Sequence, residues 1–209
     1  MKKISILIIT ILFVSCAVQK VSKPKLVMKY YEGFKKSDYQ EVKNVLSDSL
    51  IITEGDYLME FTQESYYEHF KWDSVFRPVY KIIELKNQGD QVSATVSVKS
   101  SRFEFLNNNP LTCKRNFHFK NGKINKIENL DCIDVNWEIW QRQRDSLVNW
   151  VKLNRPELDG FINDLSEQGA KDYLKAIESY KKQKIGLDTS YQERSVRLYM
   201  KILFTSVKW

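Results

Sequence analysis

Residues 117–124 read FHFKNGKI and predict a tight β-hairpin. Asn-Gly is the pair that a two-residue type I′ turn prefers, because both central residues then take a positive φ. Phe117 and Phe119 alternate with His118, so the two phenylalanines share one face of a strand and His118 points from the other. The hairpin therefore joins two strands, which we expect over 111–120 and 123–135.

Two cysteines flank this hairpin, and its register decides whether they can pair. With the Asn-Gly pair in the turn, Cys113 faces Leu130, and Cys132 is only a diagonal neighbour near the limit for bridging. A turn one residue later would place the cysteines directly opposite each other. A Cys113–Cys132 disulfide and two buried free thiols both stay open. No CxxC or HxxxH spacing accompanies them, so we expect no metal site.

Helices and a short strand precede two further strands. Alternating apolar residues predict strands over 79–86 and 92–106, and short connections make 79–135 an antiparallel meander. Upstream, apolar residues at helical spacing predict helices near Val27 and Tyr39, a strand over 47–53, and a helix from Thr62 to about Trp72.

After Asn136 the chain returns to helix, in a C-terminal helical extension that we assign to residues 136–185. We expect helices from Trp137 to about Asn154, from Pro156, and around Ala170, the last ending before Gly186. Residues 186–209 mix apolar and basic side chains. For this tail, an amphipathic helix on a bilayer, docking on the domain and disorder all stay open.

The order of these elements resembles the nuclear transport factor 2-like, or SnoaL-like, family. YYEGFKKSDY at 30–39, followed by VLSDS at 45–49, is similar to the family's opening helix, its break and its exit into the first strand. FHFKNGKI is similar to the family's late hairpin. The resemblance implies an α+β cone, in which N-terminal helices pack on a curved antiparallel sheet, and we assign it to residues 26–135.

The resemblance also raises the question of catalysis. Enzymes of the ketosteroid isomerase-like and polyketide cyclase-like kinds use an Asp or a His in the cone for proton abstraction. His69 lies on the helix that Thr62 opens. The available acids are Asp56, Asp73, Asp131 and Asp134. None of these residues sits in a motif that gives it the role, so the catalytic residues stay unassigned.

Aromatic side chains on the first helix and on the Thr62 helix are candidates for the wall of an apolar cavity. The candidate lining residues are Tyr31, Phe34, Tyr66, His69 and Trp72. The same spacing also produces ordinary core packing, and the helical extension could fill the mouth of the cone. Two histidines and isolated glycines offer neither a metal triad nor a phosphate-binding loop, so we expect no cofactor.

The first sixteen residues resemble the signal peptide of a bacterial lipoprotein. Lys2 and Lys3 precede an apolar run, 4–14, that is too short to span ~30 Å of hydrocarbon. The run ends on FVSC, similar to a lipobox. We therefore expect residues 1–15 to be removed, Cys16 to carry lipid chains such as palmitate, and residues 16–25 to act as a tether. Two or more acyl chains hold a protein stably at a membrane.

These features lead to a ranked set of functions. The segments 137–150 and 156–161 also resemble uncharacterised lipoproteins of the Bacteroidetes type. Without residues 1–15 the chain has 31 basic and 26 acidic residues, interspersed, which does not indicate nucleic-acid binding.

We expect a cell-envelope lipoprotein, anchored in the outer or inner membrane, whose non-catalytic cone domain binds a small apolar ligand or an envelope protein. The alternatives are an isomerase-like or cyclase-like enzyme and a purely structural protein. A homodimer is compatible with the resemblance.

Overall fold

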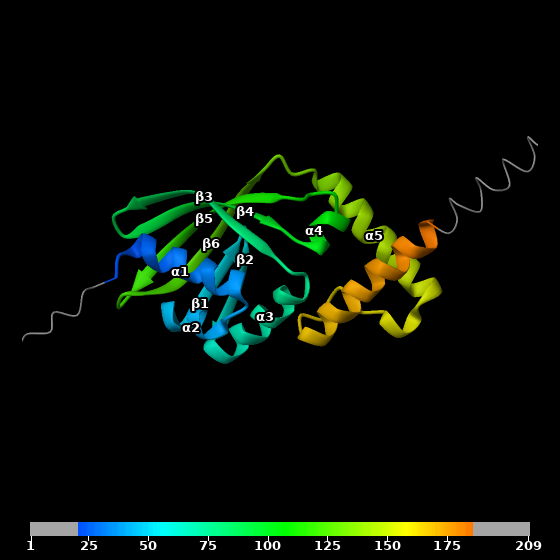
Figure 1. Cartoon of the computed structure of the whole chain (residues 1–209), viewed down its shortest axis with the longest axis horizontal. Coiled ribbons are helices and arrows are strands. Elements are labelled where there is room, and N and C mark those ends of the chain that lie inside the picture. The colour runs from blue at the N-terminus through cyan, green and yellow to red at the C-terminus, as the bar shows by residue number, and fades with distance from the viewer. Residues whose placement is uncertain (1–20, 186–209) are drawn as a thin grey trace, which may run out of the picture.

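A single curved sheet organises the fold (Figure 1). The computed structural model describes residues 21–185. The sheet has six strands in the order β2-β1-β6-β5-β4-β3. Their bounds are β1 Leu46–Glu54, β2 Tyr57–Thr62, β3 Val79–Gln88, β4 Gln91–Lys99, β5 Leu111–Lys120 and β6 Lys123–Ile133. The sequence predicted every strand except β2.

Helices cover one face of this sheet and continue beyond one end of it (Figure 1). Their bounds are α1 Lys23–Lys36, α2 Tyr39–Val45, α3 Gln63–Val75, α4 Ser101–Phe105 and α5 Trp137–Asn154. A short 3-10 helix over Pro156–Leu158 and a helix that covers 167–185 follow α5. The α+β cone with a C-terminal helical extension, which the sequence predicts, is confirmed.

One pair of strands departs from the expected antiparallel sheet. β3, β4, β5 and β6 form the predicted antiparallel meander, and β2 is antiparallel to β1. β1 and β6, however, run parallel. After β2, helix α3 carries the chain to the far edge of the sheet, and the meander then returns to β1. Its fourth strand arrives there in the same direction as β1, so the sheet is mixed.

Local sequence signals position the helices that face the sheet. The α1 helix buries Tyr30 and Phe34, which are one turn apart, against the strands. Gly33 lets α2 approach, because a Cβ there would lie 2.5 Å from the Cγ2 atom of Val42. Thr62 caps α3 as predicted, and the ring centroids of Phe61 and Tyr66 lie 5.4 Å apart, as expected of a hydrophobic staple.

The segment after β4 is a helix, and the predicted continuation of the strand to Leu106 is wrong. Ser100 ends the strand pattern, because its side chain accepts a 3.2 Å hydrogen bond from the backbone N–H of Phe103. Phe103, Phe105 and Leu106 are all buried, which a strand with one covered face does not allow for neighbours such as 105 and 106. The short helix α4 resolves this pattern.

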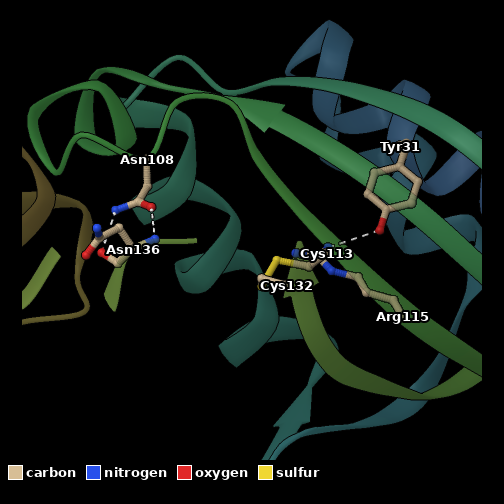
Figure 2. The surroundings of a disulfide bond; sticks show 6 residues. All are labelled: Tyr31, Asn108, Cys113, Arg115, Cys132 and Asn136. Atoms are coloured by element: carbon tan, nitrogen blue, oxygen red, sulfur yellow. Dashed lines mark hydrogen bonds between the residues drawn. A yellow bond between two sulfur atoms is a disulfide. The ribbon is translucent and has the colours of Figure 1, made fainter. Parts of the chain in front are cut away.

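The hairpin keeps the predicted turn but changes register farther from it. Asn121 and Gly122 have φ values of 52° and 75°, as a type I′ turn requires. Two irregularities in the pairing of β5 with β6 then shift the register, so that Cys113 faces Cys132 and not Leu130 as predicted. The two cysteines form a disulfide (Figure 2).

The helical extension shares a hydrophobic core with α3 and α4. This core contains Trp72, Phe76, Phe105, Leu106, Leu147, Val151, Leu158, Phe161, Ala170, Tyr173, Ala176 and Ile177. The helix expected from Pro156 is only a single 3-10 turn, since Gly160 has a φ of 89° and ends the helical path. In the described part of the chain, no helix has the length and apolarity to cross a bilayer. Cys16, the leader and the tail over 186–209 lie outside the described residues.

Candidate functional site

A cavity of about 310 Å³ lies between the sheet, α3 and the start of α5. Eight aromatic side chains line it: Tyr30, Phe34, Tyr66, Trp72, Tyr80, Phe103, Trp137 and Trp140. Its polar side chains are Glu54, His69, Asp73, Arg102, Arg115 and Asn129. Trp137 and Trp140 belong to α5, so the extension narrows the cavity without filling it.

Four of the five predicted lining residues are in this wall. Phe34, Tyr66, His69 and Trp72 line the cavity, and Tyr31 does not. The reason is helical geometry, because Tyr31 is about 100° around α1 from Tyr30. The ring of Tyr31 therefore lies toward β3 and β5, 5.3 Å from the ring of Tyr80 and 6.0 Å from that of Phe117.

Arg115 is the central polar residue of the wall. It lies on β5 between the buried side chains of Cys113 and Phe117, a position that points inward. Its Nη1 atom donates a 3.0 Å hydrogen bond to the hydroxyl of Tyr31 (Figure 2). Its Nε atom is buried and has no hydrogen-bond acceptor. Among residues 21–185, no carboxylate lies within 4.0 Å of this guanidinium.

The phenols around Arg115 stay neutral. Burial raises the pKa of Tyr30, Tyr31 and Tyr80 above the ordinary value, so each keeps its proton at physiological pH. Burial lowers the pKa of Arg115, but the hydrogen bond that its guanidinium donates to Tyr31 raises it, and the guanidinium is charged. A positive charge is thus surrounded by dipoles and not by anions.

Asp73 and His69 lie on the same face of α3, four residues apart. The hydroxyl of Tyr80 donates a 2.7 Å hydrogen bond to Oδ2 of Asp73. The imidazole of His69 stacks on the indole of Trp72 at a centroid distance of 6.2 Å and an interplanar angle of 14°. Burial lowers the pKa of His69, so its ring is neutral at pH 7 and can accept or donate one hydrogen bond.

Arg102 adds a second guanidinium from α4. Its Cζ atom lies 4.7 Å from the ring centroids of both Trp72 and Phe103, which is cation–π contact. No carboxylate lies within 4.0 Å of Arg102 among residues 21–185. Trp72 itself is 8% exposed, and its indole Nε1–H has no acceptor. Two donors of this wall, the Nε of Arg115 and the Nε1 of Trp72, are thus buried without an acceptor.

The other candidate residues lie elsewhere. Asp56, Asp131 and Asp134 are exposed and do not line the cavity. His118 is also outside it, and its Nε2 atom lies 3.0 Å from a carboxylate oxygen of Glu128. No group of three or more histidine, cysteine or acidic residues suited to a metal ion occurs within 21–185.

Three residues of the wall, Arg102, Arg115 and Tyr80, were not predicted from the sequence. The sequence pattern did contain a sign of Arg115. Residues 113, 115 and 117 lie on one face of the predicted strand, and Cys113 and Phe117 are apolar, so this face was expected to be buried. Arg102 had no such signal, since its segment reads as strand and only the cap at Ser100 makes it a helix. Tyr80 occupies an inward position of β3, but its link to Asp73 depends on the tertiary fold.

The chain was compared with family models, curated proteins and solved structures. No family model and no curated protein matches it. Similar solved structures include an NTF2-like protein of unknown function from Cytophaga hutchinsonii, with 12% identity, a TM-score of 0.45, and coverage of 54% of this chain and 92% of that one.

Two further structures have comparable similarity. A candidate polyketide cyclase from Streptomyces antibioticus shares 10% identity with a TM-score of 0.46, covering 60% of this chain and 99% of that one. An uncharacterised cystatin-fold protein from Novosphingobium aromaticivorans shares 10% identity with a TM-score of 0.46, covering 53% and 99%. At these levels the comparisons assign no function, and the site must be interpreted from its own residues.

Proposed function

We propose that this protein is a lipid-anchored envelope protein whose cone domain binds a small molecule without transforming it. The observation that carries the proposal is the cavity of about 310 Å³. This volume is at the lower end of the range for small-molecule sites, roughly 300–1,000 Å³, and such sites combine apolar walls with a few placed polar groups. A purely structural protein has no need of an unfilled space lined by two arginines.

The placement in the envelope is supported by the first sixteen residues and by the cysteines. A leader with a lipobox-like end makes Cys16 the first residue of the mature chain, and its acyl chains would hold the protein at a bilayer. A Cys113–Cys132 disulfide suits an oxidising compartment outside the cytosol. Cys16→Ser tests the anchor in fractionated cells. We expect the wild type in the membrane fraction and the variant in the soluble one. A variant that still partitions fully with membranes would contradict the anchor.

Native mass spectrometry of the protein purified from its own host tests ligand binding. Leu130 lines the cavity and is 43% exposed, so a tryptophan in its place would obstruct the mouth without replacing a core residue. Leu153 is 84% exposed and is not among the lining residues. We expect a retained small molecule on the wild type and on Leu153→Trp, but not on Leu130→Trp. The same added mass of bound compound on all three proteins, or none on any of them, would count against binding in this cavity.

Catalysis is the second candidate, and one observation favours it. Asp73 and the neutral imidazole of His69 share the aromatic cavity, and either can take a proton from a carbon acid. NMR of α-proton exchange in 2-tetralone, dissolved in D2O, separates the two functions. Asp56→Asn is the control, since Asp56 is exposed. Under the binding proposal, 2-tetralone exchanges its α-proton at the same rate in the presence of Asp73→Asn and of the control. A rate that falls by about 10² or more in Asp73→Asn alone would establish an enzyme.

A further inference from the structure

Within the described residues, the two arginines of the cavity wall form no ion pair, although the carboxylates of Glu54 and Asp73 also line the cavity. Arg102 and Arg115 both line it, and neither has a carboxylate within 4.0 Å among residues 21–185. A guanidinium taken out of water without an anionic partner is costly, because its lost hydration is not replaced by an ion pair. Structures keep such a group mostly where something else supplies the negative charge.

The carboxylates of the wall do not supply it. Asp73 accepts the hydrogen bond of Tyr80, and Glu54 is exposed at the end of β1. Neither lies within ion-pair distance of Arg115. The only acceptor that the structure gives to Arg115 is the phenol oxygen of Tyr31, which is neutral.

Two unpartnered donors occur in the same wall. The Nε atom of Arg115 and the Nε1 atom of Trp72 are both buried without an acceptor. Buried donors are nearly always paired in native proteins, so two orphans around one cavity indicate a missing acceptor. Carboxylate oxygens fit this need, because they accept several hydrogen bonds and pair with an arginine through two of them.

The rest of the wall suits an apolar body. The rings of Tyr30 and Phe34 on α1 and of Tyr66 on α3 also line the cavity, and none carries a charge. The hydroxyls of Tyr30 and Tyr66 hydrogen-bond to each other, so one of the two already has an acceptor within the protein.

Building on the proposed binding function, we propose that the ligand is a small carboxylate with an apolar, ring-sized body. Its carboxylate pairs with Arg115, and its body lies against the aromatic side chains of α1 and α3. Arg102, held by the faces of Trp72 and Phe103, adds a second positive charge to the same space.

A matched pair of probes tests this ligand class. 2-Naphthoate and 2-naphthamide share one skeleton and differ in charge. Calorimetric titration at pH 7.5 uses the complete mature chain, kept soluble by Cys16→Ser. We expect 2-naphthoate to bind at least tenfold more tightly than the amide, a difference of about 1.4 kcal/mol.

Variants on one strand assign the effect to Arg115. Arg115→Met should reduce the preference for 2-naphthoate over 2-naphthamide to within about twofold. Arg115→Lys keeps the charge but loses the paired donors, so we expect an intermediate preference. Lys114→Met is the control, because Lys114 is exposed on the same strand and carries the same charge. It should keep the full preference. The lysine variant serves as the test if the methionine variant does not fold.

The outcomes separate this inference from the proposed function. If the amide binds as tightly as the naphthoate, the carboxylate class is wrong and small-molecule binding stands. If neither probe binds but native mass spectrometry finds a retained neutral compound, the carboxylate class is again wrong and small-molecule binding again stands. If neither probe binds and nothing is retained, both proposals fail. Equal loss of preference in Lys114→Met and Arg115→Met would overturn the role of Arg115.

Discussion

Arg115 on β5 and Tyr31 on α1, 84 positions apart in the sequence, are joined by a 3.0 Å hydrogen bond from Nη1 to the phenol oxygen (Figure 2). The bond connects the helical layer to the sheet and fixes one end of the guanidinium. It also explains why a tyrosine that does not line the cavity still bears on its chemistry.

Replacing Tyr31 by phenylalanine should therefore destabilise the fold. The variant leaves a charged, buried donor without its acceptor, and we expect the free energy of unfolding to fall by about 1–3 kcal/mol. Urea titration followed by tryptophan fluorescence measures this change. Tyr57→Phe is the control, because Tyr57 is 79% exposed, and it should change stability by less than about 0.5 kcal/mol. Equal values for the two variants would remove the structural role of the Tyr31 hydroxyl.

Asn108 should be as sensitive, because it joins the loop before β5 to the start of α5. It is 7% exposed, and its side-chain nitrogen donates to the carbonyl of Leu106 at 2.9 Å. Its Oδ1 atom accepts from the backbone N–H of Asn136 at 2.9 Å (Figure 2). Asn108→Ala leaves these groups unpaired and should cost about 2 kcal/mol.

Hydrogen exchange provides the specific measurement for Asn108→Ala. Amides in the first turn of α5 should exchange faster in this variant, while those of the β5–β6 hairpin should change only by the global loss of stability. Asn163→Ala is the control, since Asn163 is exposed. A uniform change across the chain would mean that Asn108 does not hold the extension locally.

The disulfide should contribute to stability through the loop it closes. Cys113 and Cys132 are 19 residues apart in the sequence, and a loop of this size corresponds to roughly 3 kcal/mol in the chain-entropy treatment. Dithiothreitol should then lower the Tm by roughly 6–12 °C for a chain of this length. The Cys113→Ser/Cys132→Ser variant should start at the lower Tm and not respond to reductant. If dithiothreitol lowers the Tm of this variant as much as that of the wild type, the effect of the reductant does not come from the Cys113–Cys132 disulfide.

His69 should make stability depend on pH below neutrality. Burial lowers its folded pKa below the ordinary value of 6.5, so stability is full above pH 6.5 and falls as pH drops toward the folded pKa, because only the unfolded chain then binds the proton. Asp73 opposes this shift, and Arg102 and Arg115 reinforce it. Urea titrations at pH 7.5, 6.5 and 5.5 should show a smaller decline for His69→Gln than for the wild type. Parallel declines would contradict a neutral, buried imidazole.

Much of the fold could be predicted from the sequence, because local patterns encode it. The Asn-Gly pair specified the turn of the β5–β6 hairpin, and Thr62 specified the start of α3. The register beyond the turn could not be predicted in the same way, since bulges depend on how β5 and β6 pack as a whole. The segment that forms α4 was predicted as strand for a local reason: Phe103, Glu104 and Phe105 alternate as in a strand, and only the cap at Ser100 indicates a helix.

The site could be predicted only in part. Phe34 on α1, and Tyr66, His69 and Trp72 on α3, follow from helical spacing, which indicates the inward face of each helix. The partnership of Arg115 with Tyr31, or of Asp73 with Tyr80, joins elements distant in the sequence, and no spacing rule contains it. The orphaned nitrogens of Arg115 and Trp72 became visible only in the folded chain.

The core that α5 shares with α3 and α4 has a practical consequence for anyone shortening this chain. A fragment that ends at Val135 would expose the apolar side chains of Trp72, Phe76 and Leu106 to water. In the intact protein these side chains are almost completely buried. We expect such a fragment to self-associate through this apolar surface. Its cavity would also lose the wall that Trp137 and Trp140 form. Crystallisation and screening projects should therefore retain everything through residue 185.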